Sequence, residues 1–108
     1  MSYNVISIPP FDKQIKRLVK KFPSLKTEFA LLLNLLEENP EQGISLIKSC
    51  YKIRIAIKSK GKGKSGGARI ITHFQVNKGN VYLLAIYDKS EQDDLKDNEL
   101  IHLLNYID

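Results

Sequence analysis

The chain has 108 residues, of which 43% are hydrophobic and 27% are charged, and its formal net charge is +5 at pH 7. This length supports one domain, residues 1–108, with a modest core, and the apolar fraction argues against disorder. No stretch approaches the roughly 20 apolar residues of a membrane-spanning helix, and residues 1–10 lack the basic start and apolar run of a signal peptide. The single cysteine, Cys50, excludes an internal disulfide and fits a reducing cytoplasm.

Positive charge is concentrated in the middle of the chain. Residues 42–87 contain no aspartate or glutamate, because five of the twelve acids precede this segment and seven follow it. Such a segment attracts polyanions, and nucleic acid is the commonest polyanion that a small protein meets. A solvated lysine-rich loop is the alternative interpretation. The segment holds nine basic residues: Lys48, Lys52, Arg54, Lys58, Lys60, Lys62, Lys64, Arg69 and Lys78.

The first 40 residues predict a strand and two helices. Residues 3–8 alternate modestly, which suggests a short strand that Pro9-Pro10 ends. Asp12 is predicted to cap a helix, and Ser24 a second helix that ends at Asn39-Pro40. Because the link between them is short, the two helices should pack as an antiparallel hairpin. The side of the first helix opposite its apolar stripe is basic: Lys13, Lys16, Arg17, Lys20 and Lys21.

The sequence period then changes from helical to two. Residues 51–58 predict a strand with three isoleucines on one face and Lys52, Arg54 and Lys58 on the other. Residues 59–67 consist of glycine, lysine and serine, and they predict a loop.

Two further strands are predicted after this loop. Residues 68–76 form the first, with Arg69 and His73 on its polar face. A hairpin turn at residues 77–80 leads to residues 81–87, a wholly apolar strand that is typical of the interior of a sheet.

The last part of the chain predicts a helix or a pair of turns, opened by a capping box at residues 90–93. The predicted order is therefore β-α-α-β-β-β-α, an α+β fold. It consists of an antiparallel meander with the N-terminal helical hairpin and the C-terminal helix packed on one face. Lys52, Arg54 and Arg69 point to the other, open face.

Two familiar kinds of site are excluded. Gly63-Lys64-Ser65 resembles the end of a phosphate-binding P-loop, but the glycine required five residues earlier is replaced by Lys58, and a strand rather than a helix follows. A metal site is also not predicted, because His73 and His102 are the only histidines and no carboxylate lies at ligand spacing from His73. No cofactor is predicted.

The remaining candidate is a cationic site built from Lys52, Arg54, Arg69 and Lys89. Arginine binds phosphate oxygens in a bidentate way, and four converging cations suit a scissile phosphate. Lysine loses its proton more readily when other cations crowd it, so Lys52 is a candidate base. A groove that binds without catalysis is an equal alternative. His73 is a secondary candidate, against a purely structural role.

Three parts of the chain carry a recognisable pattern. They are Lys-Ile-Arg at residues 52–54, the Gly/Lys loop at 60–64 with Gly-Gly-Ala-Arg-Ile-Ile at 66–71, and the run from Tyr82 to Glu91 with Asp-Leu at 94–95. In these segments the chain resembles the RelE/HigB branch of toxins from bacterial type II toxin–antitoxin systems, within the RelE/ParE superfamily. The resemblance covers about residues 11–104 and is looser in the N-terminal helices.

This resemblance implies a microbial ribonuclease-like fold and a cytoplasmic endoribonuclease that enters the ribosomal A site and cuts mRNA. The expected reaction is metal-free attack of the ribose 2′-hydroxyl on the adjacent phosphate. Of Lys52 and Arg54, one would activate the hydroxyl and the other would stabilise charge. Arg69 would stabilise the transition state and Lys89 would assist the leaving 5′-oxygen. A cognate antitoxin is the implied protein partner, in a possible hetero-oligomer.

The predicted RNA-binding residues are Lys58, Lys60, Lys62, Lys64, His73 and Tyr87. Some RelE members carry a further arginine after the last strand and a base-stacking tyrosine in the last helix. Here the corresponding segment is Ser90-Glu91-Gln92, and Tyr87 is a better stacking candidate than Tyr106. ParE toxins share the fold and poison DNA gyrase, so a ParE-like gyrase inhibitor is an alternative function. A non-catalytic basic RNA-binding module is another.

Overall fold

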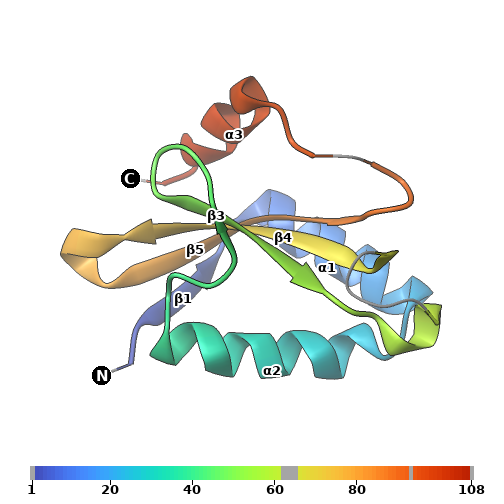
Figure 1. Ribbon diagram of the computed structural model, residues 1–108. Helices are drawn as coiled ribbons and strands as arrows, with labels where there is room; N and C mark the ends of the chain where they lie inside the picture. The colour runs from blue at the N-terminus through green and yellow to red at the C-terminus, as the bar shows by residue number, and fades with distance from the viewer. Residues whose placement is uncertain (1, 62–65, 93, 108) are drawn as a thin grey trace.

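The computed structural model describes residues 2–61, 66–92 and 94–107. These residues form a five-stranded sheet in the order β1-β5-β4-β3-β2, with three α-helices around it (Figure 1). The strands are β1 (Asn4–Ser7), β2 (Ile44–Ser45), β3 (Cys50–Ile55), β4 (Ala68–Gln75) and β5 (Asn80–Asp88). The helices are α1 (Pro9–Lys21), α2 (Leu25–Glu38) and α3 (Asp97–Leu104). The predicted α+β class is confirmed.

The antiparallel meander is formed by β3, β4 and β5, as predicted. The first strand joins β5 in parallel, which makes the sheet mixed, and the two-residue β2 pairs with β3 at the other edge. A strand as short as β2 shows no measurable period in the sequence, so it was not predicted. At the β4–β5 turn Gly79 has φ +65°, a left-handed conformation that glycine adopts without steric cost.

The helical hairpin of α1 and α2 is also present, but α1 begins earlier than predicted. It starts at Pro9 and places Asp12 in its first turn instead of at its cap. Proline suits the first helical turn because its φ is already helical and its missing N–H has no partner to lose there. The second helix has Ser24 at its N-cap, as predicted.

The C-terminal helix differs from the prediction in its start and in its place. Instead of opening a helix, Ser90 donates its N–H and its hydroxyl to the Asp88 carboxylate (3.0 and 3.1 Å), and a turn results. Helix α3 starts at Asp97, where the Lys96 N–H is bound by the Glu99 carboxylate (3.2 Å).

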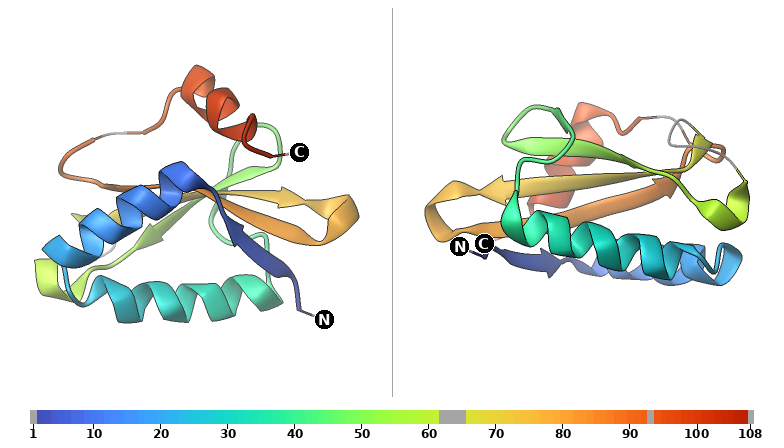
Figure 2. Two further views of the ribbon diagram at one scale, coloured as in Figure 1. Left: turned by 180° about the vertical axis from the view of Figure 1, so that it is seen from behind. Right: turned by 60° about the horizontal axis from the view of Figure 1, so that its bottom comes forward.

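Figures 1 and 2 show α3 on the opposite side of the sheet from α1 and α2, so the prediction that all the helices share one face is wrong. The reason is that the face expected to be open is only partly polar. It carries the buried side chains of Ile71 and Tyr87, and Leu95 and Leu100 lie with them around one cavity. Apolar surface of this size needs cover.

None of the helices in the described part of the chain is long and apolar enough to cross a membrane.

Candidate functional site

The register of the sheet brings three predicted cations onto one face. Arg54 of β3 lies directly opposite Arg69 of β4, and Arg69 lies opposite Tyr87 of β5. Lys52 is two residues before Arg54 on the same face, opposite Ile71. Directly opposed like charges on a sheet repel one another. A negatively charged group beside both guanidinium groups therefore stabilises this arrangement.

The two arginines are held differently. Arg69 is buried, with 3% of its surface exposed, and its guanidinium donates to the Ala68 carbonyl (3.2 Å). Arg54 is exposed. A buried guanidinium is fixed in position, whereas an exposed one can reach toward a ligand. The pair therefore combines a fixed donor with a mobile one, which suits the binding of two oxygens of one phosphate.

Lys52 is covered by a carboxylate. Its ammonium donates to Asp94 Oδ1 (2.9 Å), and the Tyr87 hydroxyl donates to the same oxygen (3.3 Å). The side chain of Lys52 is 14% exposed, and that of Asp94 is 64% exposed. The hydrogen bond from Lys52 is the main cause of a lowered pKa at Asp94. An exposed anion thus occupies the position at Lys52 that an oxygen of a bound phosphate would take.

A cavity of about 270 Å³ lies beside this contact. Lys52, Ile71, Tyr87, Asp94 and Leu95 are among its lining residues. Its lining combines apolar side chains with one cation, Lys52, and two carboxylates, Asp94 and Asp97.

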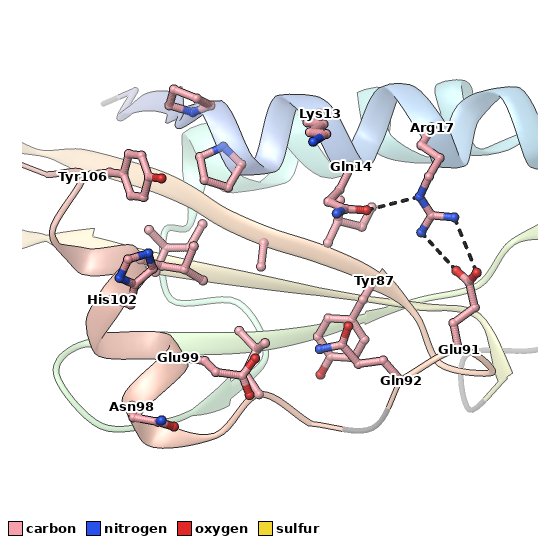
Figure 3. A pocket seen from close by; sticks show the side chains of 17 residues that line it. Lys13, Gln14, Arg17, Tyr87, Glu91, Gln92, Asn98, Glu99, His102 and Tyr106 are labelled. Atoms are coloured by element: carbon pink, nitrogen blue, oxygen red, sulfur yellow. Dashed lines mark hydrogen bonds and ion pairs between the residues drawn. The ribbon is translucent and has the colours of Figure 1, made fainter.

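A larger groove of about 1190 Å³ runs between α1 and α3 along β5 (Figure 3). Its two sides are formed by Lys13 and Arg17 of α1 and by Glu99 and His102 of α3. Tyr87 lines both this groove and the smaller cavity, so the two spaces adjoin at its side chain.

Lys89 follows β5 directly and is half-buried. Its backbone N–H donates to the Gly67 carbonyl (3.1 Å), which holds it beside the start of β4. A Cβ atom at position 67 would lie 2.0 Å from the Ile55 carbonyl oxygen, so only glycine fits this close approach to β3. Gly67 therefore fixes the backbone of Lys89 near the end of the sheet that carries Arg69.

The four predicted RNA-binding lysines of residues 58–64 do not share one environment. Lys60 forms an ion pair with Asp88 and donates to the Ser90 hydroxyl (2.6 Å), and only 9% of its side chain is exposed. Lys58 is exposed, and its backbone N–H donates to Glu28 (2.7 Å). Lys62 and Lys64 lie outside the described residues. Lys60 thus stabilises the end of β5 in this conformation, and its contact with RNA stays a prediction.

Asp88 is the centre of this second cluster. Its side chain is 2% exposed. Burial raises the pKa of Asp88, but the hydrogen bonds from Lys60 and from the N–H and hydroxyl of Ser90 outweigh burial, and the pKa is lowered overall. The carboxylate is therefore ionised, and it fixes the turn that carries Lys89.

His73 lies away from the cations, opposite Cys50 at the far end of β4. Its Nδ1 is 2.9 Å from the Lys48 carbonyl, to which it donates, and 3.8 Å from the Cys50 sulfur. These contacts tie the loop before β3 to the sheet. Burial raises the pKa of the Cys50 thiol to about 11, so this sulfur is a poor nucleophile.

No group of three or more His, Cys, Asp or Glu side chains suited to a metal ion occurs among the residues that the structure describes. The sequence analysis gave no catalytic or binding role to Asp88 or Asp94. Asp88 is the first acid after the acid-free segment and Asp94 is the fourth. Acids that follow a basic segment so closely are well placed to neutralise it, and this position was the available signal.

No family model matches the chain. A solved structure of the E. coli toxin RelE, a double arginine-to-alanine mutant in the free state, is similar over 99% of both chains, with a TM-score of 0.65 and 14% sequence identity. At this identity the likeness concerns the fold. The chain therefore has the fold of the RelE toxin.

Proposed function

We propose that residues 1–108 form the toxin of a type II toxin–antitoxin system, a metal-independent endoribonuclease that cuts mRNA on the ribosome. The observation that best supports this function is the placement of Arg54 and Arg69 directly opposite one another, with Lys52 on the same face. Three cations in this arrangement would bind a phosphate. They stand on a fold that is similar to that of a known toxin. The cytoplasm is the compartment in which such an enzyme would act.

The proposed reaction breaks one phosphodiester bond. The ribose 2′-oxygen attacks the adjacent phosphorus, its proton passes to the side-chain nitrogen of Lys52, and the bond from phosphorus to the 5′-oxygen breaks. Arg54 and Arg69 stabilise the charge on the non-bridging oxygens. Lys89 supplies a proton or positive charge to the leaving 5′-oxygen. The products are a 2′,3′-cyclic phosphate and a 5′-hydroxyl.

Asp94 must leave Lys52 before this reaction occurs. The lowered pKa of Asp94 makes its carboxylate a weak base, so we assign it no proton transfer. The incoming phosphate would replace its oxygen at Lys52. The Tyr87 hydroxyl also binds Asp94, so the displacement would release that hydroxyl. The Tyr87 ring is 5% exposed and belongs to the core, so its stacking on a base stays a prediction.

Lys58, Lys60, Lys62, Lys64 and His73 stay proposed RNA-binding residues, although His73 lies at the other end of β4 from Arg69. A cognate antitoxin would neutralise the toxin by covering the cationic face, and it should be acidic where it does so. Co-expression of this chain with a small protein encoded by an adjacent reading frame, followed by purification of a complex, tests this partner.

The function is tested by mapping mRNA ends in a translation extract with wild type, Lys52→Ala, Arg54→Ala and Arg69→Ala. Each substitution should reduce cleavage by about 100-fold or more, the usual loss when a base or an electrostatic stabiliser is removed. Lys78→Ala is the matched control, because Lys78 is exposed in the β4–β5 turn. Undiminished cleavage by all three variants would overturn the proposal. Inhibition of DNA gyrase supercoiling without any RNA cleavage would replace it with a ParE-like function.

A further inference from the structure

Helix α1 carries a row of cations that the proposed reaction does not use. Its members are all exposed: Lys13, Lys16, Arg17, Lys20 and Lys21. Their spacing of three and four residues places them on one side of the helix, while Phe11 and Leu18 are buried on the other. A shallow groove of about 510 Å³ is lined, within the described part of the chain, by these five cations alone. We refer to them as the α1 row.

Most of the charge in the α1 row is not neutralised. Arg17 and Lys21 form ion pairs with Glu91 at 3.0 and 3.7 Å. Within the described residues, no carboxylate lies within ion-pair distance of the other three members. These are Lys13, Lys16 and Lys20. The row therefore has positive charge to offer a negatively charged partner.

The composition of the α1 row favours nucleic acid over protein as that partner. Protein interfaces are depleted in lysine and have an apolar or aromatic centre. Among the residues that the structure describes, the groove of the α1 row has no apolar lining residue, and it contains four lysines. Lysine side chains bind phosphates through charge, without the geometry that base recognition requires.

The α1 row is also connected to the proposed cleavage site. Lys13 and Arg17 line the large groove along β5, and this groove reaches Tyr87 (Figure 3). Tyr87 in turn lines the cavity that contains Lys52. A strand of RNA leaving Lys52 past Tyr87 would therefore meet α1 next.

From these observations we propose that the α1 row binds the phosphate backbone of RNA at a second site, separate from the strand cations; this inference rests on the proposed function. From Lys13 to Lys20 the helix rises by about 10 Å. Along the axis of a duplex, one strand carries a phosphate about every 3.4 Å, so the row is about as long as three phosphates. The occupant is the single-stranded message, because the large groove leads from Tyr87 to α1. Double-helical RNA is the alternative that the test separates.

The test measures binding without cleavage. Two labelled RNAs carry 2′-O-methyl groups, which remove the attacking hydroxyl: one is a single strand and the other a hairpin duplex. The variant replaces Lys13, Lys16 and Lys20 by glutamine, which keeps helix propensity. Loss of about three phosphate contacts should reduce the log–log salt slope by roughly 2 to 3. The Kd should then rise on the order of 100-fold at 0.1 M salt and converge with wild type near 1 M.

The matched control replaces Lys26, Lys48 and Lys78 by glutamine, which removes the same charge from exposed positions elsewhere. It should change the salt slope far less. The single strand should show the larger difference, and a difference confined to the hairpin duplex would overturn the assignment to the message. An equal loss in the control variant would overturn the proposal, because net charge alone would then explain binding. Binding of a poly-glutamate peptide is measured with the same variants. If the α1 variant bound RNA as wild type does but no longer bound this peptide, the proposal would be overturned in favour of an acidic protein partner.

Two features keep this test independent of other failures. Thermal unfolding of the triple variant is expected to match wild type, and if it does not, the three single variants should each remove about a third of the slope change. Because the probes cannot be cut, an inactive enzyme would still report on the α1 row. Conversely, normal RNA cleavage with an unchanged salt slope would disprove the second site alone.

Discussion

At the end of β5 the ammonium of Lys60 lies between Asp88 and Ser90, largely hidden from solvent. Across β3 and β4, by contrast, Arg54 is exposed beside Arg69, and the acid that covers Lys52 is itself mostly in solvent. The first cluster is an internal ion pair with several hydrogen bonds. The second is a set of cations with a displaceable anion. Basic residues of the same segment therefore either stabilise the fold or face solvent. The exposure of the partner acid distinguishes the two cases: Asp88 is buried, whereas Asp94 is exposed.

The largest expected effect comes from breaking the buried cluster. Asp88→Ala leaves the Lys60 ammonium without its carboxylate, and loss of one partner of a buried pair typically destabilises by about 3 kcal/mol or more. Urea denaturation of wild type and variant measures the free energy of unfolding. Lys78→Ala, at an exposed turn position, is the control and should lie within about 0.5 kcal/mol of wild type. A similar small loss for Asp88→Ala would show that the two clusters do not differ as described.

Acid should weaken the same cluster. The pKa of Asp88 is lowered in the folded protein, so the unfolded chain binds more protons at this carboxyl around its ordinary pKa of about 3.9. Its contribution to stability is therefore complete above that pKa and is lost as the pH falls through the lower folded value. The difference in unfolding free energy between wild type and Asp88→Asn should shrink below about pH 4. A difference that stays constant from pH 7 to pH 3 would contradict the ionised pair.

A smaller and opposite effect is expected at the displaceable anion. Asp94→Asn removes the charge that competes with phosphate at Lys52, so binding of 2′-O-methyl RNA should tighten by about threefold to tenfold, as for about 1 kcal/mol of removed competition. Stability should change little, because Asp94 is mostly exposed. Glu38→Gln is a suitable control, since Glu38 is exposed in α2 and forms no ion pair among the described residues. Weaker RNA binding by Asp94→Asn would mean that Asp94 positions Lys52 for its ligand instead of blocking it.

These clusters also show what the sequence could and could not predict. Strand periodicity placed Lys52, Arg54 and Arg69 on one face correctly, because side-chain direction in a strand follows from alternation alone. The environment of Lys60 was not predictable in this way. Its ion pair joins residues 28 positions apart, and such contacts depend on the path of a loop. The lysine pattern there indicates only a solvated segment.

The fold shows the same division. The helical hairpin and the meander follow from local patterns, but the place of α3 depends on how much apolar surface the second face of the sheet exposes. Ile71 and Tyr87 provide that surface, yet Ile71 stands in the sequence among residues assigned to a polar face. The start of α1 at Pro9 could not be predicted from the sequence for another reason. Two prolines indicate the end of a strand and the first turn of a helix equally well.

The smallest expected effect concerns the contact between Glu91 and Arg17, which joins the turn after β5 to helix α1. Glu91 lies in the turn after Asp88, and it accepts two hydrogen bonds from Arg17 of the α1 row (3.0 and 3.4 Å). The arginine hydrogen bond is the main cause of the lowered pKa of Glu91. Because both side chains are partly exposed, Glu91→Gln should cost less than about 1 kcal/mol of stability.

The same substitution should strengthen RNA binding slightly, because it releases Arg17 and Lys21 to a phosphate and so raises the salt slope by about 1. Glu37→Gln provides the control, as it removes an exposed acid that lies in α2. If Glu91→Gln weakened binding, the ion pair would be orienting the α1 row, and the role of Glu91 would match that of the buried Asp88. If binding tightened as expected, Glu91 would resemble Asp94, an acid that occupies a cationic surface until RNA replaces it.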